Sequence, residues 1–200
     1  MKTHLIKLLL IISFYSCKAQ TTILALEEKN IPDDLTGVYF KDLNNELNKF
    51  EGTWLYQNGN TSLTVTLFKK EEVFNGEWYN DELQGEYQYV ENGIEILNYL
   101  TRLNDPNIFN ALHTIDGNKV VYPDYYPECT DCQAGEKRFV MNFTDLDRRY
   151  LNNQILVQHI NDNGIEKIKI HIGSSGSIVI PQGTPAETRV PYGEYILIKQ

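Results

Sequence analysis

The amino-acid sequence predicts an all-β domain, an antiparallel meander that closes into a barrel, with a two-sheet sandwich as the alternative. Two observations carry this prediction. Apolar residues alternate with polar ones over many short segments, and Asn-Gly or Asp-Gly dipeptides fall between these segments. The repeated helical segments that α/β architectures place between their strands are not found in the sequence.

Each predicted strand has one apolar face, as expected for a sheet that is buried on one side. The alternating apolar residues are Leu63, Val65 and Leu67; Tyr87 and Tyr89; Phe139, Met141 and Phe143; and Ile168, Ile170 and Ile172. The turn dipeptides lie at 58–59, 92–93, 116–117 and 163–164, and Asn, Asp and Gly tolerate the positive φ of type I′ hairpin turns. Consecutive hairpins are therefore expected.

One short amphipathic N-terminal helix is predicted over residues 41–50. Leu43, Leu47 and Phe50 recur there at helical spacing, which would place them on one face. The region that follows is predicted to be mostly strand. No internal repeat is visible, so a single domain is expected over residues 35–200.

Residues 1–16 are predicted to be a signal peptide, because a basic start precedes a short apolar run over 8–12 that leads to Ser16-Cys17. The run is far shorter than the roughly 20 residues of a membrane-spanning helix. The Ser-Cys junction resembles the lipobox of bacterial lipoproteins, which implies cleavage before Cys17 and a lipid on its thiol. The alternative is an ordinary signal peptide that is cut near Ala19.

The mostly polar residues 17–34 are expected to tether the domain to that lipid anchor. Residues 18–21 lack the acidic cluster associated with surface export in Bacteroidetes, which favours an outer-membrane anchor facing the periplasm. The formal net charge of −9 at pH 7 repels nucleic acid. The sequence therefore predicts a cell-envelope protein that has a lipid anchor and no nucleic-acid partner.

A Gly-x-Trp motif, Gly52-Thr53-Trp54, follows the predicted helix at the start of the first long strand. It resembles the opening of calycin barrels, the lipocalins and their relatives. The resemblance implies a barrel whose base is formed by Gly52 and Trp54, since glycine permits close approach and the indole fills the narrow end. It also implies a binding module for a small apolar ligand.

Three further segments, 50–60, 85–93 and 196–200, resemble an uncharacterised family of flavobacterial secreted lipoproteins, a domain of unknown function. The resemblance extends from about residue 35 to the C-terminus. The matching residues form turns, the Gly-x-Trp motif and a closing strand. The resemblance therefore implies a family and no particular activity.

Cys129 and Cys132 are the remaining cysteine pair once Cys17 carries lipid. An oxidising envelope favours a structural disulfide between them. A redox-active dithiol, free thiols and a metal site are the alternatives, and a zinc site would want two further Cys or His ligands, which are not nearby in the sequence.

The loop predicted over 122–135 gathers three tyrosines, Tyr122, Tyr125 and Tyr126, around Asp124. Aromatic faces beside carboxylates suit stacking on a sugar or the binding of a cationic or peptide ligand. The alternative is that these tyrosines only pack the loop against the strands. This loop is the candidate ligand site, and His159 is interpreted as a buried histidine at the rim of the barrel.

Catalytic and cofactor-binding motifs are not found in the sequence: it has no Gly-x-Ser-x-Gly, no phosphate-binding glycine loop and no dinucleotide fingerprint. No catalytic residue, metal or cofactor is assigned. Three hypotheses remain. The leading one is a non-catalytic binding module for a small apolar ligand or an envelope component. The second is an interaction or structural lipoprotein that docks a protein or glycan through the 122–135 loop, and the third is a hydrolase.

Overall fold

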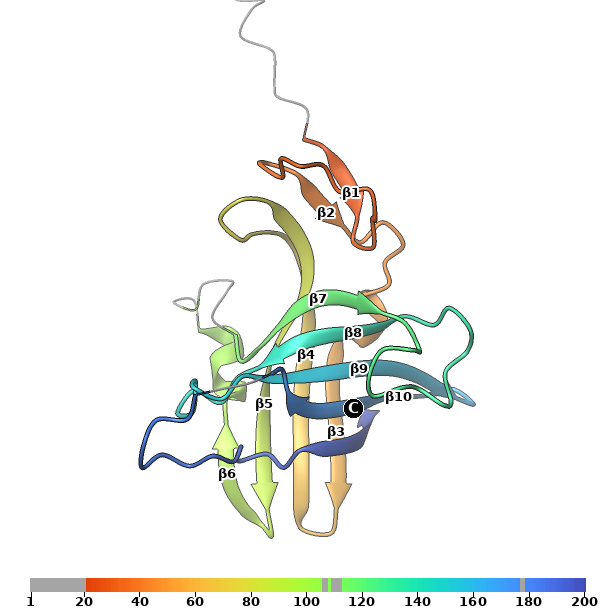
Figure 1. Cartoon of the computed structure of the whole chain (residues 1–200). Coiled ribbons are helices and arrows are strands. Elements are labelled where there is room, and N and C mark those ends of the chain that lie inside the picture. Colours follow the sequence, from red (N-terminus) through yellow and green to blue (C-terminus); the bar gives the residue numbers. More distant parts are fainter. Residues whose placement is uncertain (1–20, 106–107, 109–112, 177–178) are drawn as a thin grey trace, which may run out of the picture.

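The computed structural model describes residues 21–105, 108, 113–176 and 179–200, and these form a closed, eight-stranded antiparallel barrel with additional strands (Figure 1). The barrel prediction is confirmed over the sandwich. The predicted signal peptide and Cys17 lie outside the described residues. Among the residues described, no helix has the length and apolar character that a membrane span needs.

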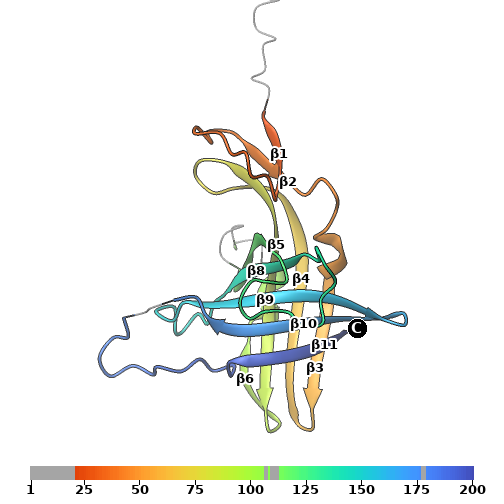
Figure 2. The ribbon, with the colours of Figure 1, turned by 45° about the vertical axis from the view of Figure 1, so that its right-hand side comes forward.

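Eleven strands within the described residues belong to one continuous sheet. They are β1 (Ile23–Ala25), β2 (Tyr39–Lys41), β3 (Gly52–Asn58), β4 (Thr61–Phe74), β5 (Tyr79–Glu91), β6 (Ile94–Asn98), β7 (Ile115–Val121), β8 (Arg138–Phe143), β9 (Asn153–Asp162), β10 (Ile165–Ser174) and β11 (Gly193–Lys199). The barrel follows the order β5-β4-β3-β11-β10-β9-β8-β7 and closes where β7 pairs with β5. Figure 2 shows that β3, β4 and β5 cross β8, β9 and β10 steeply.

The predicted alternation decides which side chains face the barrel interior. All the alternating apolar residues predicted from the sequence are buried. Two of the predicted turns, Asn92-Gly93 and Asn163-Gly164, are the two-residue loops of antiparallel hairpins. The turn predicted at Asn58-Gly59 forms one residue later, at Gly59-Asn60, because Asn58 still pairs with Thr61. The glycine of each of these three turns has a positive φ. The fourth prediction was wrong, because Asp116-Gly117 lies inside β7, where the register with β8 shifts at a bulge.

The predicted helix over 41–50 is also corrected by the structure. Only a short 3-10 turn, η2 (Asn48–Phe50), forms there. Leu47 and Phe50 are fully buried as the spacing suggested, but Leu43 is 56% exposed. The carboxylate of Asp42 accepts hydrogen bonds from two backbone N–H groups, one of them that of Leu47, and this stabilises a turn in place of a regular helix.

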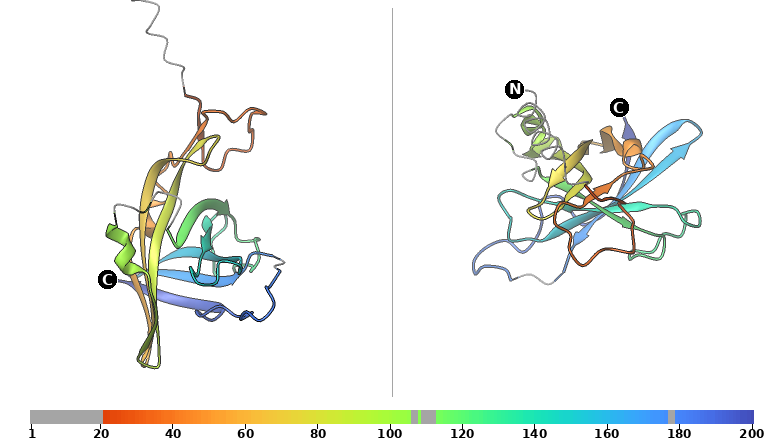
Figure 3. Two further views of the ribbon diagram at one scale, coloured as in Figure 1. Left: turned by 90° about the vertical axis from the view of Figure 1, so that its left-hand side faces the viewer. Right: turned by 90° about the horizontal axis from the view of Figure 1, so that it is seen from above.

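The N-terminal strands extend the sheet beyond the barrel. β1 pairs in parallel with β2, and β2 pairs in parallel with the first residues of β5. The β4–β5 hairpin continues past the end of β3 to meet them, as the left view of Figure 3 shows. Residues 23–25, within the predicted tether 17–34, are therefore folded onto the domain.

Candidate functional site

The loop between β7 and β8, residues 122–137, lies against the outer face of the barrel wall. Tyr125 packs on an apolar cluster of Val121, Val140 and Leu156, outside the main core. Tyr126 is 83% exposed, so the tyrosines of the predicted ligand site do not converge on one cavity. The loop therefore packs through Tyr125 against the outer face of β7, β8 and β9.

Arg138, the first residue of β8, organises this loop. Its guanidinium donates hydrogen bonds to the carbonyl oxygens of Tyr122, Pro123, Tyr125 and Pro127, at 2.8–3.2 Å. The side chain is buried, and this burial lowers the pKa of Arg138 from its ordinary value. The sequence analysis did not single out this residue, because an arginine at a strand end is usually a solvent-facing residue.

The Cys129–Cys132 disulfide is present in the structure, with a sequence separation of 3 residues. Asp131 lies between the two cysteines, and its carboxylate binds Lys169 of β10 at 2.7 Å. Hydrogen bonding to that lysine lowers the pKa of Asp131. Because the two sulfur atoms are bonded to each other, they do not offer the thiolates that a zinc site takes.

A hollow of about 520 Å³ opens between this loop and the end of β9, and we call it the β9 hollow. It is lined by Lys49, Asp131, residues 133–136 and residues 158–161. The walls are polar and internally hydrogen-bonded, since Glu136 accepts bonds from the side chain of Gln158 and from a loop N–H group. The volume lies in the range of ligand sites, about 300–1,000 Å³.

The edge of β9 beside this hollow lacks a partner strand among the described residues. The pairing of β9 with β8 ends at Val157, whereas its pairing with β10 continues to Asp162. Both residues of the Asn163-Gly164 turn have positive φ, as in a type I′ turn, so Asp162 forms a hydrogen-bonded pair across the hairpin. By alternation, the backbone groups of His159 and Asn161 point away from β10, toward the hollow.

His159 lies at this end of the barrel, where its ring meets Phe50 and Trp54 edge to face, with centroids at 5.9 Å and 6.3 Å. Its Nε2 atom is 3.7 Å from a carboxylate oxygen of Glu166. Burial lowers the pKa of His159, which favours the neutral ring. The contacts are those of a packing residue at the rim.

Gly52 and Trp54 lie at the start of β3, directly after η2. The indole of Trp54 is fully buried and donates a hydrogen bond of 2.8 Å to the carbonyl of Phe50. Gly52 has φ +125°, and a Cβ there would lie 3.1 Å from the Lys199 side chain, whose ammonium sits 5.1 Å from the Trp54 ring. The glycine thus leaves room for a lysine over the indole.

Side chains fill the barrel interior within the part of the chain that the structure describes. The fully buried interior residues include Trp54, Tyr87, Phe139, Phe143, Leu63, Leu67, Leu83, Ile115, Met141 and Ile155. Tyr87 stacks on Phe143 with ring centroids 4.3 Å apart. Protein side chains therefore occupy the interior space in which a lipocalin would bind its ligand.

Comparison with known proteins adds a family to this geometry. The model of a family of unknown function, DUF6705, matches residues 1–200, the whole chain. The chain belongs to this family. The resemblance to a domain of unknown function is confirmed, and the barrel agrees with the calycin-like resemblance. No curated protein and no solved structure is detectably similar to this DUF6705 chain.

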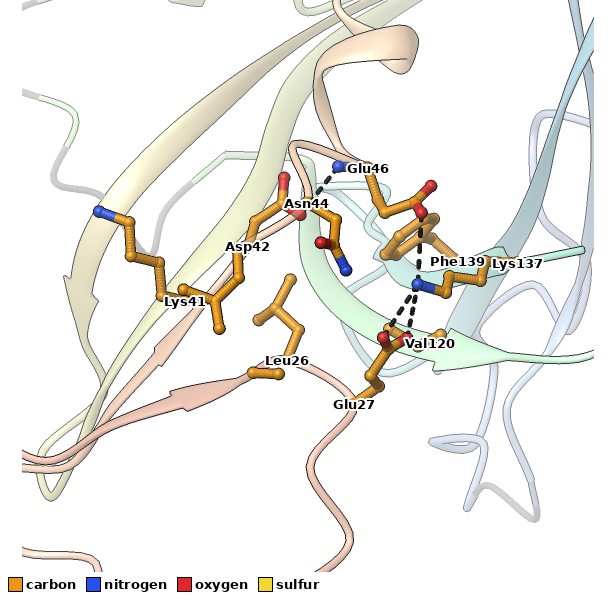
Figure 4. Close-up of a pocket in the computed structure, with 11 residues that line it drawn as sticks. Leu26, Glu27, Lys41, Asp42, Asn44, Glu46, Val120, Lys137 and Phe139 are labelled. Atoms are coloured by element: carbon orange, nitrogen blue, oxygen red, sulfur yellow. Dashed lines mark hydrogen bonds and ion pairs between the residues drawn. The ribbon is translucent and has the colours of Figure 1, made fainter.

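A second, smaller hollow in the DUF6705 barrel lies beneath its N-terminal segment (Figure 4). Its volume of about 20 Å³ is too small for a ligand larger than water. The ammonium of Lys137 bridges Glu27 and Glu46 at 2.8 Å and 3.3 Å, and Leu26 packs on the core nearby. These contacts hold the N-terminal segment against the end of the barrel beside β8.

The outer wall carries two carboxyl groups that the sequence analysis did not select, Glu82 on β5 and Asp116 on β7. Burial raises the pKa of both. Amide side chains already hold them: Asn80 and Gln84 donate to Glu82, and Asn142 donates to Asp116. No sequence signal marked Glu82, which sits on the polar face of β5, and Asp116 was interpreted only as part of a predicted turn.

Proposed function

We propose that this protein is an exported, lipid-anchored binding module that holds an extended segment of an envelope protein at the β9 hollow. The observation that carries the proposal is the unpaired edge of β9 beside a hollow of about 520 Å³. An extended peptide can pair its backbone with such an edge and gain affinity from main-chain hydrogen bonds. A partner protein therefore fits this site better than a glycan does.

The filled interior argues against a small apolar ligand inside the barrel. A ligand pocket of ordinary size would have to displace packed side chains such as Tyr87 and Phe143. The hydrolase hypothesis is not supported by the described residues either. Glu82 and Asp116, whose pKa values are raised, lie on the outer wall and accept hydrogen bonds from amide side chains.

The binding site is tested by filling the hollow. Ala134 lines it and is exposed, so Ala134→Trp should block it without disturbing the core. Peptides selected from a random library on the folded domain should protect the amides of His159 and Asn161 from hydrogen exchange. The Ala134→Trp variant should lose this binding, and Ala186→Trp, at an exposed loop position, should keep it. Selected peptides that bind Ala134→Trp equally well would overturn the assignment.

The anchor is tested separately. The thiol of Cys17 is the group that lipidation would use, and two acyl chains hold a soluble domain firmly at about 0.8 kcal/mol per buried methylene. Cys17→Ser should move the protein from the detergent phase to the aqueous phase in a partition assay. Unchanged partition would contradict the lipoprotein assignment, but it would not bear on the proposal for the β9 hollow.

A further inference from the structure

The β4–β5 hairpin carries exposed aromatic rings at its tip. Phe74 and Tyr79 are 54% and 36% exposed, and their ring centroids lie 4.9 Å apart. On the opposite face of the hairpin, Trp78, partly exposed, meets the edge of Phe40 at 6.4 Å. Scattered single apolar residues are normal on protein surfaces, whereas a cluster of rings marks an interaction site.

A row of aromatic and apolar side chains links the hairpin to the first described strand. The registers of β1, β2, β5 and β4 align Ile23, Tyr39, Tyr79 and Phe74 in one row across the sheet. Ile23 is 53% exposed at the end of this row. Tyr39 lies within it, buried and donating a hydrogen bond to Asp81, which fixes β2 against the hairpin.

The same end of the molecule is the one that approaches the proposed anchor. β1 and the hairpin tip lie together beyond one end of the barrel in Figures 1 and 3. Ile23 follows Cys17 by six residues, which span about 20 Å when fully extended. A lipid on Cys17 therefore keeps this end within reach of the bilayer surface.

We propose that the tip of the β4–β5 hairpin rests in the headgroup region of the membrane to which the chain is anchored. Trp and Tyr rings favour that interface, because an apolar ring and a polar edge are both accommodated there. This inference rests on the Cys17 anchor of the proposed function and is independent of the β9 hollow. The lipid supplies the attachment, and the aromatic tip fixes the orientation of the barrel.

The charges at this end define the kind of membrane surface. Glu77 lies at the hairpin turn, whose geometry is set by Asn75, which accepts hydrogen bonds from the N–H groups of Glu77 and Trp78. Glu71 and Glu72 lie in β4, shortly before the tip. Lys41 lies over the ring of Tyr39 on β2, behind the tip. The turn itself carries a carboxylate, which anionic headgroups repel, so the tip fits a surface of zwitterionic lipid.

The protein offers a direct experiment, because it has two tryptophans and three cysteines. Cys129 and Cys132 are bonded, so Cys17 is the free thiol of a chain that begins at that residue. This chain is coupled through Cys17 to maleimide lipid in phosphatidylcholine vesicles with brominated acyl chains. Trp78 emission should be lost by quenching, whereas the buried Trp54 should keep its emission.

Three variants make the result specific. Trp78→Phe should abolish the quenching, and Phe74→Ser should weaken it because it removes the most exposed ring of the tip. Ile196→Ser, at a 48% exposed position on β11, should leave it unchanged. Circular dichroism on each variant confirms that the barrel is folded.

Absence of quenching in the coupled wild-type protein would overturn the proposal, as would equal quenching in folded Phe74→Ser. Cross-linking of Trp78 to a protein in cells, without quenching by lipid, would replace the membrane with a protein partner. Chemical coupling bypasses cellular lipidation. Failure here is therefore distinct from failure of the Cys17→Ser partition test.

Discussion

Three of the buried charged side chains in this barrel bind loop backbone. Arg138 donates to four carbonyl groups of the 122–137 loop, and Asp42 accepts the N–H groups before η2. Asp145 accepts a backbone N–H two residues on and the guanidinium of Arg189. A buried charge left unpaired is costly, so each of these residues holds its loop in one conformation.

Trp54 offers the clearest test of packing at the residue scale. Its side chain is fully buried and hydrogen-bonded, so Trp54→Ala should lower the free energy of unfolding by about 3–5 kcal/mol. Urea unfolding of the domain measures this loss. Tyr126→Ala, at an 83% exposed position, is the matched control and should change stability little. A loss below about 1 kcal/mol for Trp54→Ala would contradict its role at the barrel base.

The ion pair of Asp145 predicts a dependence on pH. Burial by itself would raise the pKa of Asp145, but hydrogen bonds from Arg189 and the Asp147 N–H hold it below its ordinary value. A lowered carboxyl pKa adds stability above the unfolded pKa of about 3.9 and loses it as the pH falls further. Asp145→Asn should therefore be destabilising at pH 7, and the difference from wild type should shrink below about pH 4.

Unfolding measured between pH 2 and pH 7 checks this behaviour. Asp162→Asn is a suitable comparison, because the Lys167 pair it breaks is exposed to solvent and should change stability little. A difference between Asp145→Asn and wild type that stayed constant down to pH 2 would contradict the assignment.

At the scale of elements, the disulfide and Arg138 are two of the restraints on the 122–137 loop. The disulfide closes a short loop, so the chain-entropy model gives it about 2 kcal/mol. Replacing Cys129 and Cys132 by serine should therefore lower the melting temperature modestly and loosen Tyr125 and Tyr126. A double variant that fails to fold, or two free thiols in the native protein, would contradict this.

Arg138→Lys should affect the same loop more strongly. An ammonium keeps the charge but loses the planar set of donors that reaches four carbonyl groups. Hydrogen exchange over residues 122–127 should rise more in Arg138→Lys than in the cysteine variant. The opposite order would show that the disulfide is the main restraint on the loop.

Local patterns explain how much of the fold was predictable. Alternation at Leu63, Val65 and Leu67 identified β4, because one face of that strand enters the core. β1 and β2 were missed, since three-residue strands are too short to show a period. The spacing of Leu47 and Phe50 predicted a helix but reflects burial of a turn, which Asp42 stabilises through side-chain hydrogen bonds.

The candidate site was less predictable for a different reason. Tyr122, Asp124, Tyr125 and Tyr126 directed attention to the 122–135 loop, but the proposed site, the β9 hollow, opens beside the other half of that loop, residues 133–136. That hollow depends on where the pairing of β8 with β9 stops, which is a tertiary property. A single sequence carries no signal for it.

At the scale of the whole molecule, the packed interior predicts that the barrel does not take up apolar ligands. Stacked and edge-to-face aromatic pairs, such as Tyr87 on Phe143 and Phe50 on Phe139, occupy the space. Titration with a fluorescent fatty-acid probe should show no stoichiometric binding to the native domain. Partly unfolded protein in urea is the positive control. Saturable binding of one probe per native chain would instead support the hypothesis that the barrel binds a small apolar ligand.

The first and last barrel strands along the chain pair with each other, since β11 meets β3 through Ile198 and Lys199, and the ring cannot close without this pair. These residues contact Leu55 and Trp54, almost the full length of the domain away along the chain. Such high contact order makes ring closure late, because the loop entropy is lost before the contact forms. We expect a chain emerging N-terminus first from a translocation channel to remain open until its final residues have crossed. Under the proposed export, folding of the barrel would therefore follow translocation.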